Sequence, residues 1–303
     1  MSILPAGRVL FTHEDDLNKA RSLLAGVKLP PQPKVVMDLS AEIRKPDPNF
    51  DKMVTLLSGD PALSAKLLRV VNSPLYGLTR RVDSLRHALS LLGMKNFFGI
   101  VLATALRDAL LGSKENANSK PMEDFWTYSM VVARITKYLI VRNPMLGELV
   151  GADQAYLAGL FHDCAIPMFI GKHPDYAETV RTAKENRQNI FDAEEERYGA
   201  HHGAIGFMIA RSWELPDPVC QAIRYHHYPY LEAGVVDETT ALEILPLYEI
   251  LRLGDFLGEH LLEAKGRDVA GCYRDQEEFL LHVNMTEQEL EDLKEDVVDS
   301  ISL

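Results

Sequence analysis

The 303-residue chain has little cysteine, and its three cysteines show no pairing pattern. Cys164, Cys220 and Cys272 lie far apart without a CxxC spacing, which argues against a zinc ribbon and against a disulfide framework. We therefore expect a protein of a reducing compartment. Cys164 follows an adjacent His-Asp pair, but an ordinary buried thiol is a simpler interpretation than a redox centre.

Long hydrophobic runs are also absent. The longest, FFGIVLATAL at residues 97–106, has about half the length that a membrane-spanning helix requires. The amino-terminal stretch MSILPAGRVLFTHEDD lacks the basic n-region and the continuous apolar h-region of an export signal. The sequence therefore predicts a soluble, cytoplasmic protein that does not enter a membrane.

Positive charge is in deficit as well, because 32 Lys and Arg residues stand against 44 Asp and Glu residues. A nucleic-acid binder needs a basic face that displaces counterions from phosphates, so direct DNA binding is not expected. The composition, with 47% hydrophobic and 25% charged residues, predicts a chain that is folded throughout.

Alternating strand patterns are missing, whereas helical patterns recur. In GDPALSAKLLRVVNSP, Asp60 is expected to cap a helix that begins at Pro61. The stretch SLRHALSLLGMKNFFGIVLATALRDALLG predicts two helices, capped at Ser84 and divided at Gly93. A further helix places Tyr128 on an inward apolar face. The other residues of that face are Phe125, Val132, Ile135 and Leu139. The predicted fold class is therefore all-α, a multi-helix bundle.

More helices are expected toward the end of the chain. The patterns indicate segments at about 152–164, 174–187, 192–212, 217–227 and 241–265. The last segment, TEQELEDLKEDVVDSISL, opens with a capping box formed by Thr286 and Glu289 and carries apolar residues on one face. This amphipathic helix needs a surface to dock on, which is either this chain or a partner.

Histidines offer the clearest candidates for chemistry. The stretch LAGLFHDCAIP sets an adjacent His-Asp pair at the end of an apolar helical run, and two tandem His pairs follow it. These residues are His162, Asp163, His201, His202, His226 and His227. Imidazole and carboxylate groups that converge from different helices suit iron, manganese or zinc. Histidines at helix ends also occur without any ligand, so the spacing alone leaves both interpretations open.

Six motifs occur in a fixed order between about Leu29 and Pro229. They are LPPQPKVV, GDPALSAKLLRVVNSPLYG, SLRHALSLLGMKNF, FWTYS, LAGLFHD and GAHHGAIGFMIARSWELPDPVCQAIRYHHYP. Together they resemble the HDOD family, a branch of the HD superfamily of metal-dependent phosphohydrolases that occurs in bacterial signalling proteins. The ordered set is specific, although each motif alone is weak.

The resemblance implies a helical lobe packed on a second lobe built like an HD domain. We expect residues 1–26 to form an extension with a short helix, and residues 27–115 to form the first lobe. Residues 119–285 would form the HD-like lobe, and 286–303 the terminal amphipathic helix. The polar stretch GSKENANSKP at 112–121 marks the boundary between the lobes.

In catalytic HD proteins, a histidine on the first helix of the lobe, the His-Asp pair and a late aspartate surround one metal ion. Some members add histidines and a second ion. The resemblance therefore implies one or two divalent ions, namely iron, manganese or zinc. Tyr128 occupies the position of the first histidine in FWTYS. The implied ligands are His162, Asp163, His202, His226, His227 and Asp255.

Three departures from the family pattern bear on catalysis. Tyr128 replaces one ligand, and Ala165 and Ile166 stand where relatives that cleave cyclic dinucleotides have glycine and lysine. The pair His226 and His227 is not followed by a Gly-Tyr-Pro signature. The chain thus lacks the diagnostic features of a cyclic dinucleotide phosphodiesterase.

Three functional hypotheses follow. The first is a non-catalytic signal-transduction module that binds a protein partner or a small ligand, with a degenerate metal site that is either able to hold an ion or empty. The alternative is a metal-dependent phosphohydrolase that acts on a nucleotide or cyclic nucleotide. A third is a structural protein whose terminal helix, residues 286–303, forms a homo-oligomer.

Overall fold

A computed structural model of the chain describes residues 13–24, 32–73, 76, 78–111, 120–228, 238–263, 280 and 285–301. Within these ranges the regular secondary structure is helical and contains no strand. The predicted all-α fold class is therefore confirmed. Cys272 and residues 112–119, which belong to the predicted lobe boundary, lie outside the described residues.

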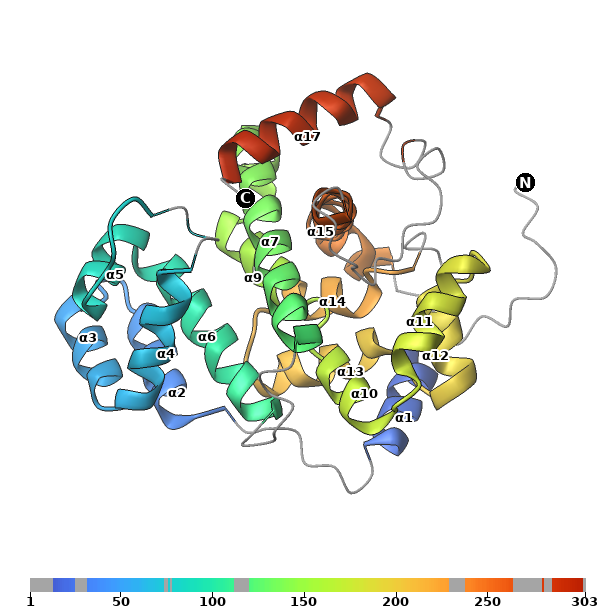
Figure 1. Cartoon of the computed structure of the whole chain (residues 1–303), viewed down its shortest axis with the longest axis horizontal. Helices are drawn as coiled ribbons and strands as arrows, with labels where there is room; N and C mark the ends of the chain where they lie inside the picture. Colours follow the sequence, from blue (N-terminus) through green and yellow to red (C-terminus); the bar gives the residue numbers. More distant parts are fainter. Residues whose placement is uncertain are drawn as a thin grey trace.

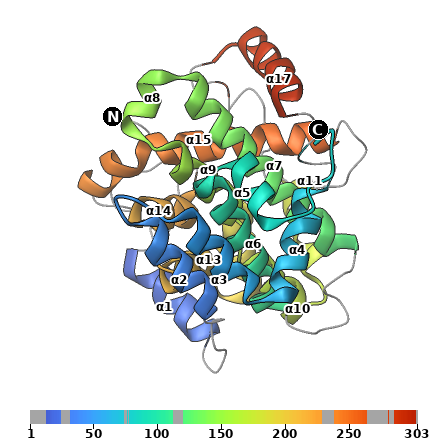
Figure 2. The same ribbon diagram turned by 90° about the vertical axis from the view of Figure 1, so that its left-hand side faces the viewer.

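The first group of helices lies at the left of Figure 1 and faces the viewer in Figure 2. It comprises α2 (Lys34–Ile43), α3 (Phe50–Ser58), α4 (Pro61–Val71), α5 (Leu85–Leu92) and α6 (Met94–Leu111). The predicted caps are confirmed, because Asp60 accepts from the backbone N–H of Leu63 at 3.0 Å and Ser84 accepts from that of His87 at 3.2 Å. Helix α6 contacts α2, α4 and α5 on one side and α9 and α10 on the other, and so joins the two groups.

The second group is built around α7 (Lys120–Arg142), α9 (Ala152–Phe161) and α15 (Glu238–Glu263), which contact one another. Helices α13 (His202–Ser212) and α14 (Asp217–Tyr225) pack together, and α14 also contacts α9 and α15. The remaining helices of this group are α1 (His13–Leu23), α8 (Pro144–Leu149), α10 (Ile166–Lys172), α11 (Tyr176–Glu185) and α12 (Ile190–Tyr198). Tyr128 lies on the buried face of α7, as predicted.

One predicted helix is wrong in extent. Instead of a single helix over 192–212, the chain forms α12 and α13 with a break at Gly199, whose φ of 86° lies in the left-handed region that favours glycine. The break places His201 at the start of α13, where its ring accepts from the backbone N–H of Ala204. Helix α10 was not predicted, because it has only seven residues.

The terminal helix α17 (Glu287–Ile301) docks on this chain, where it contacts α7 and α15. Its capping box is confirmed: Thr286 donates its backbone N–H to Glu289 at 2.8 Å, and the backbone N–H of Glu289 donates to the Thr286 hydroxyl at 3.2 Å. Leu290 and Val297 are fully buried. The apolar face therefore has a partner within the chain.

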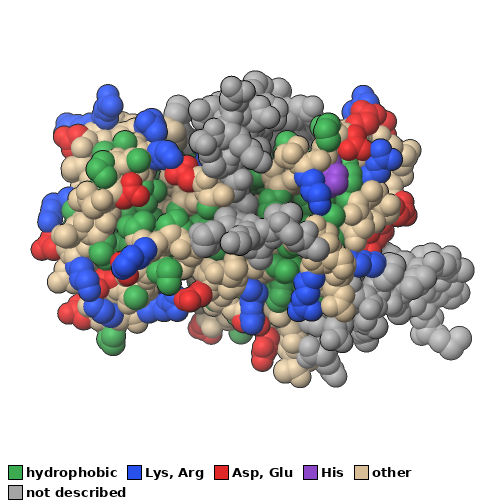
Figure 3. Space-filling view, turned by 90° about the horizontal axis from the view of Figure 1, so that it is seen from below, with side chains coloured by type: hydrophobic (Ala, Val, Ile, Leu, Met, Phe, Trp, Pro, Cys, Tyr) green, Lys and Arg blue, Asp and Glu red, His purple; other side chains and the backbone are tan. Residues whose placement is uncertain are grey.

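The described surface is mixed in charge where Figure 3 shows it, with acidic and basic side chains lying among one another. Of the helices that the structure describes, none is both long enough and apolar enough to cross a membrane.

Candidate metal centre

Three histidine rings are held in the same way, each by its Nδ1 atom. His162 Nδ1 lies 2.8 Å from the carbonyl oxygen of Gly159, and His226 Nδ1 lies 2.7 Å from that of Ile223. His202 Nδ1 lies 2.8 Å from both carboxylate oxygens of Glu194. Because these oxygens only accept hydrogen bonds, Nδ1 carries the proton in each neutral ring and Nε2 keeps its lone pair for a metal.

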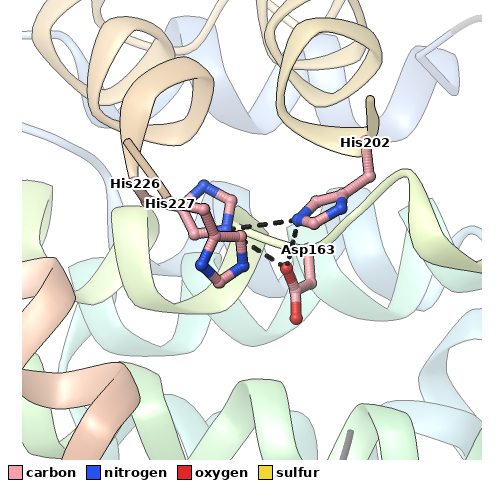
Figure 4. Close-up of side chains that lie close together, drawn as sticks. All are labelled: Asp163, His202, His226 and His227. Carbon is pink, nitrogen blue, oxygen red and sulfur yellow. Dashed lines mark hydrogen bonds and ion pairs between the residues drawn. The ribbon is translucent and has the colours of Figure 1, made fainter. Parts of the chain in front are cut away.

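Four side chains bring their ligand atoms to one place. Asp163, His202, His226 and His227 each offer an atom, and these atoms all lie within 4.8 Å of one another. Figure 4 shows His202 approaching Asp163 from one side and the tandem pair from the other. The residues come from the end of α9, the first turn of α13 and the end of α14.

The spacing of these atoms matches a metal site. Asp163 Oδ1 lies 3.2 Å from His202 Nε2 and 3.3 Å from His226 Nε2, and the two nitrogens are 3.4 Å apart. Ligands of a tetrahedral ion with bonds of about 2.0–2.1 Å are separated by roughly 3.3 Å. Asp163, His202 and His226 therefore have the spacing of ligands to one divalent ion, and His227 offers a fourth atom within 4.8 Å of the others.

Asp163 has a second oxygen, which faces a different set of residues. Its Oδ2 lies 3.1 Å from His162 Nε2, and the same nitrogen lies 3.2 Å from Asp255 Oδ1. The Tyr128 hydroxyl donates to Asp255 Oδ1 in a short hydrogen bond. We call this set, His162, Asp255 and Tyr128, the tyrosine side of Asp163. The other set, His202, His226 and His227, is the histidine side.

Two buried atoms in the centre lack a well-formed hydrogen bond among the described residues. They are His162 Nε2 and Asp163 Oδ1. Both lie within ion-pair distance of neighbours. Buried polar groups are normally satisfied, so a buried carboxylate oxygen without a hydrogen bond, such as Asp163 Oδ1 in the four-atom cluster, is typical of a metal ligand.

Burial and charge control the protonation of these rings. Burial opposes charge on His202, but Glu194 and Asp163 outweigh it and raise the pKa of His202 to about 9. Burial, together with the neighbouring His226 and His202, lowers the pKa of His227 well below its ordinary value. Burial and Asp255 raise the pKa of Tyr128 well above its ordinary range, so its phenol stays protonated.

Glu194 is a functional residue that the sequence reasoning missed. Its carboxylate is fully buried and accepts from His202 Nδ1, from the backbone N–H of His202 at 2.7 Å and from the Tyr176 hydroxyl at 2.6 Å. Such a carboxylate fixes the tautomer and direction of a ligand ring. In the sequence it is one of three consecutive glutamates, Glu194, Glu195 and Glu196, and no local signal singles it out.

The buried ring of Phe191, on α12, packs against the three histidine rings of the histidine side. Its centroid lies 4.9 Å from that of His202, 5.4 Å from that of His226 and 5.1 Å from that of His227. The preceding helix cap, Asn189, donates to the backbone oxygen of His227 at 2.6 Å. The start of α12 therefore positions the tandem pair, just as Glu194 positions His202.

All the predicted ligands lie in this one region, but they divide between the two sides of Asp163. His202, His226 and His227 share the four-atom cluster with Asp163. His162 and Asp255 lie on the tyrosine side, where Tyr128 stands beside them. Cys164 is a buried thiol whose pKa is raised by burial, in agreement with the prediction.

The fold and the site together define an all-helical protein with a buried histidine-aspartate centre between α9, α13 and α14. Residues 29–229 match the HDOD domain family. The chain therefore belongs to the HDOD family, as its motifs predicted.

A curated relative is an uncharacterized protein of Treponema pallidum (strain Nichols), which is 23% identical over 204 residues. The match covers 66% of this chain but only 37% of that protein. The chain thus corresponds to part of a longer relative.

Three solved structures share the fold. An HDOD domain protein with unknown function from Geobacter sulfurreducens is 24% identical with a TM-score of 0.67, over 95% of this chain and 96% of that one. A structure from Marinobacter aquaeolei VT8, named "Putative signal transduction protein", is 22% identical with a TM-score of 0.68, over 96% and 65%. Another from Shewanella amazonensis SB2B, named "Putative phosphohydrolase", is 20% identical with a TM-score of 0.64, over 97% and 96%.

Proposed function

We propose that this chain is a regulatory signalling module of the HDOD type, whose histidine side holds one divalent ion that orders the fold instead of catalysing a reaction. The observation that carries this proposal is the convergence of four ligand atoms, from Asp163, His202, His226 and His227, within 4.8 Å of one another in a buried site. Three imidazoles and one carboxylate favour zinc or iron over manganese, which prefers oxygen ligands.

Burial supports the non-catalytic part of the proposal. None of the six predicted ligands is more than 9% exposed. A phosphate ester would have to reach the ion through this packing, and the lysine that binds phosphate in catalytic relatives is replaced by Ile166. An ion held in this way contributes its binding free energy to folding.

The tyrosine side is not expected to bind a second ion. Asp255 Oδ1, which faces His162 Nε2, already accepts the hydrogen bond of Tyr128. A phenol that stays protonated does not supply a ligand to a divalent ion. We therefore expect one bound ion per chain and an unfilled tyrosine side.

The rival function is a metal-dependent phosphohydrolase for a nucleotide or cyclic nucleotide. It is supported by the metal-like donor set and by the name of the Shewanella amazonensis structure. In this rival the ion would lower the pKa of a bound water, and Asp163 and the three histidines would hold the ion. The regulatory module, in contrast, passes its output to a protein partner and can bind a nucleotide without hydrolysing it.

Metal content and turnover, measured on the same protein samples, test the proposal. Protein made without a histidine tag is analysed by inductively coupled plasma mass spectrometry and screened with phosphomonoester and phosphodiester substrates plus manganese or iron. The matched control is His87→Ala, because His87 is an exposed histidine on α5 far in sequence from the centre. We expect about one zinc or iron per chain in the wild type and in the control, and little in His226→Ala.

Turnover separates the two functions. Metal-dependent hydrolysis that is lost in Asp163→Ala and retained in His87→Ala would replace the regulatory module with the phosphohydrolase. Wild-type protein that stays free of metal after reconstitution would contradict both.

A further inference from the structure

Helix α1 is attached to the second group of helices by a buried ion pair. Asp16 is 4% exposed and Arg224, on α14, is fully buried. Arg224 Nε donates to Asp16 Oδ2 at 3.1 Å, and Arg224 Nη2 donates to Oδ1. Two hydrogen bonds to one carboxylate form the strongest kind of side-chain pair, and removal of the Asp16 charge takes this compensation away from a buried guanidinium.

Two further polar contacts of α1 fall beside the metal centre, whereas Lys172 of α10 donates to the backbone oxygen of Leu23 at the end of α1. Asp16 Oδ2 lies 3.7 Å from His201 Nε2, and His201 directly precedes His202. Lys19 donates to Glu195 at 2.9 Å, and Glu195 directly follows the carboxylate that holds His202. Arg224 itself precedes His226 by two positions. The contacts with His201, Glu195 and Arg224 therefore land one or two residues from a residue of the centre.

These contacts join two segments that must keep their relative position for the ion to bind. His201 caps α13, which carries His202, and Arg224 belongs to α14, which leads into His226 and His227. The two helices meet closely here, because a Cβ added to Gly203 would lie 2.7 Å from the Arg224 backbone oxygen. One carboxylate of α1 thus contacts the beginning of α13 and the end of α14 together.

We propose that α1 is a detachable strap, and that its docking through Asp16 sets the affinity of the histidine side for its ion. With 11 residues, α1 is too short to be a stable helix in water on its own, so it is helical because it is docked. Release of α1 takes the carboxylate away from Arg224 and loosens α13 against α14. By linkage, the bound ion must hold α1 in place to the same extent.

The test uses the full chain and zinc as the probe. Asp16→Asn removes the charge and keeps the shape, and Asp38→Asn makes the same change in the exposed pair of Lys34 and Asp38 on α2, whose atoms are 2.6 Å apart. We expect zinc to bind Asp16→Asn about tenfold more weakly, within the usual range of coupling between sites. Zinc binding by Asp38→Asn should equal that of the wild type.

Hydrogen exchange on the wild type gives a second readout that needs no variant. We expect zinc to slow exchange of the α1 amides while leaving α3, in the first group of helices, unchanged. Equal zinc affinity in all three proteins, or α1 exchange that zinc does not alter, would overturn the strap. If Asp16→Asn does not fold, the exchange experiment decides alone.

The strap rests on the proposed function, and the two fail in different ways. Wild-type protein that binds no zinc contradicts the metal centre and the strap with it. Wild-type protein that binds zinc without any link to α1 contradicts the strap alone.

Discussion

The two sides of Asp163 contain similar residue types but differ in their hydrogen bonding. On the histidine side, Oδ1 faces His202 and His226, whose Nε2 atoms lie 3.2 and 3.3 Å away. On the tyrosine side, Oδ2 faces His162 at 3.1 Å, but the next carboxylate, Asp255, is occupied by the hydroxyl of Tyr128. The histidine side gathers four donor atoms that could hold an ion, whereas the carboxylate of the tyrosine side already accepts a hydrogen bond.

The difference teaches how one hydrogen bond can separate two sets of similar residues. His162 and Asp255 lie beside each other, and the Tyr128 hydroxyl donates to the Asp255 oxygen that faces His162. Four predictions test this comparison, from the largest expected effect to the smallest.

Removal of the shared carboxylate should abolish metal binding on the histidine side. In Asp163→Asn the bridging charge is lost while the volume is kept, so metal content should fall below about one-tenth of the wild type. Atomic spectroscopy measures this, with circular dichroism as the check on folding. A variant that is folded and still holds a full equivalent of metal would show that the ion lies elsewhere.

Replacement of Tyr128 by a histidine should allow the tyrosine side to bind a second ion. Tyr128→His removes the donor to Asp255 and supplies an imidazole on the inward face of α7, so metal content should rise from about one to about two ions per chain. Tyr128→Phe serves as the control, because it removes the same hydroxyl without a new ligand. An unchanged content in Tyr128→His would mean that the tyrosine alone does not keep the second ion out.

Loss of the Glu194 charge, which holds the His202 ring, should weaken metal binding without abolishing it. Glu194→Gln keeps the shape and removes the charge that fixes His202 Nδ1, which should cost about 10–100-fold in metal affinity. Glu196→Gln is the matched control, since Glu196 is an exposed residue of the same helix that bonds only to Gln188 among the hydrogen bonds described. Equal zinc dissociation constants in the two variants would remove Glu194 from the site.

The stability of the metal-free protein should depend on pH through the protonation of His202. Its pKa of about 9 lies above the ordinary value of 6.5, so the protonated ring contributes stability that is fully present below pH 6.5 and is lost as the pH rises through about 9. Metal affinity should rise over the same window, because the ion displaces that proton. Urea unfolding of metal-free protein across this range measures the first effect, and Glu194→Gln should flatten it.

Much of the fold was accessible from the sequence, since local signals suffice for helices. The caps at Asp60 and Ser84 and the capping box at Thr286 follow from residue chemistry within four positions of the chain, and all three are present. The helix expected over 192–212 was wrong because a glycine within a helical pattern is tolerated or terminating according to tertiary context. At Gly199 it terminates a helix and thereby brings His202 to a helix start.

The sequence predicted which residues form the site but not how they are arranged. Motif order pointed to His162, Asp163, the tandem histidines and Asp255, which all lie in one region. The division between the two oxygens of Asp163 depends on side-chain directions, and the roles of Glu194 and Asp16 depend on contacts between distant segments, such as the pair of Asp16 with Arg224, 208 positions apart. No sequence pattern carries that information.

The most direct test of the single ion on the histidine side is X-ray absorption spectroscopy of zinc-loaded wild-type protein. We predict about one zinc per chain with three imidazole ligands and one oxygen at about 2.0 Å, and the same spectrum from His162→Ala, because His162 lies on the tyrosine side. A zinc ion with only one imidazole, or one whose spectrum changes in His162→Ala, would contradict the assignment of the ion to the histidine side.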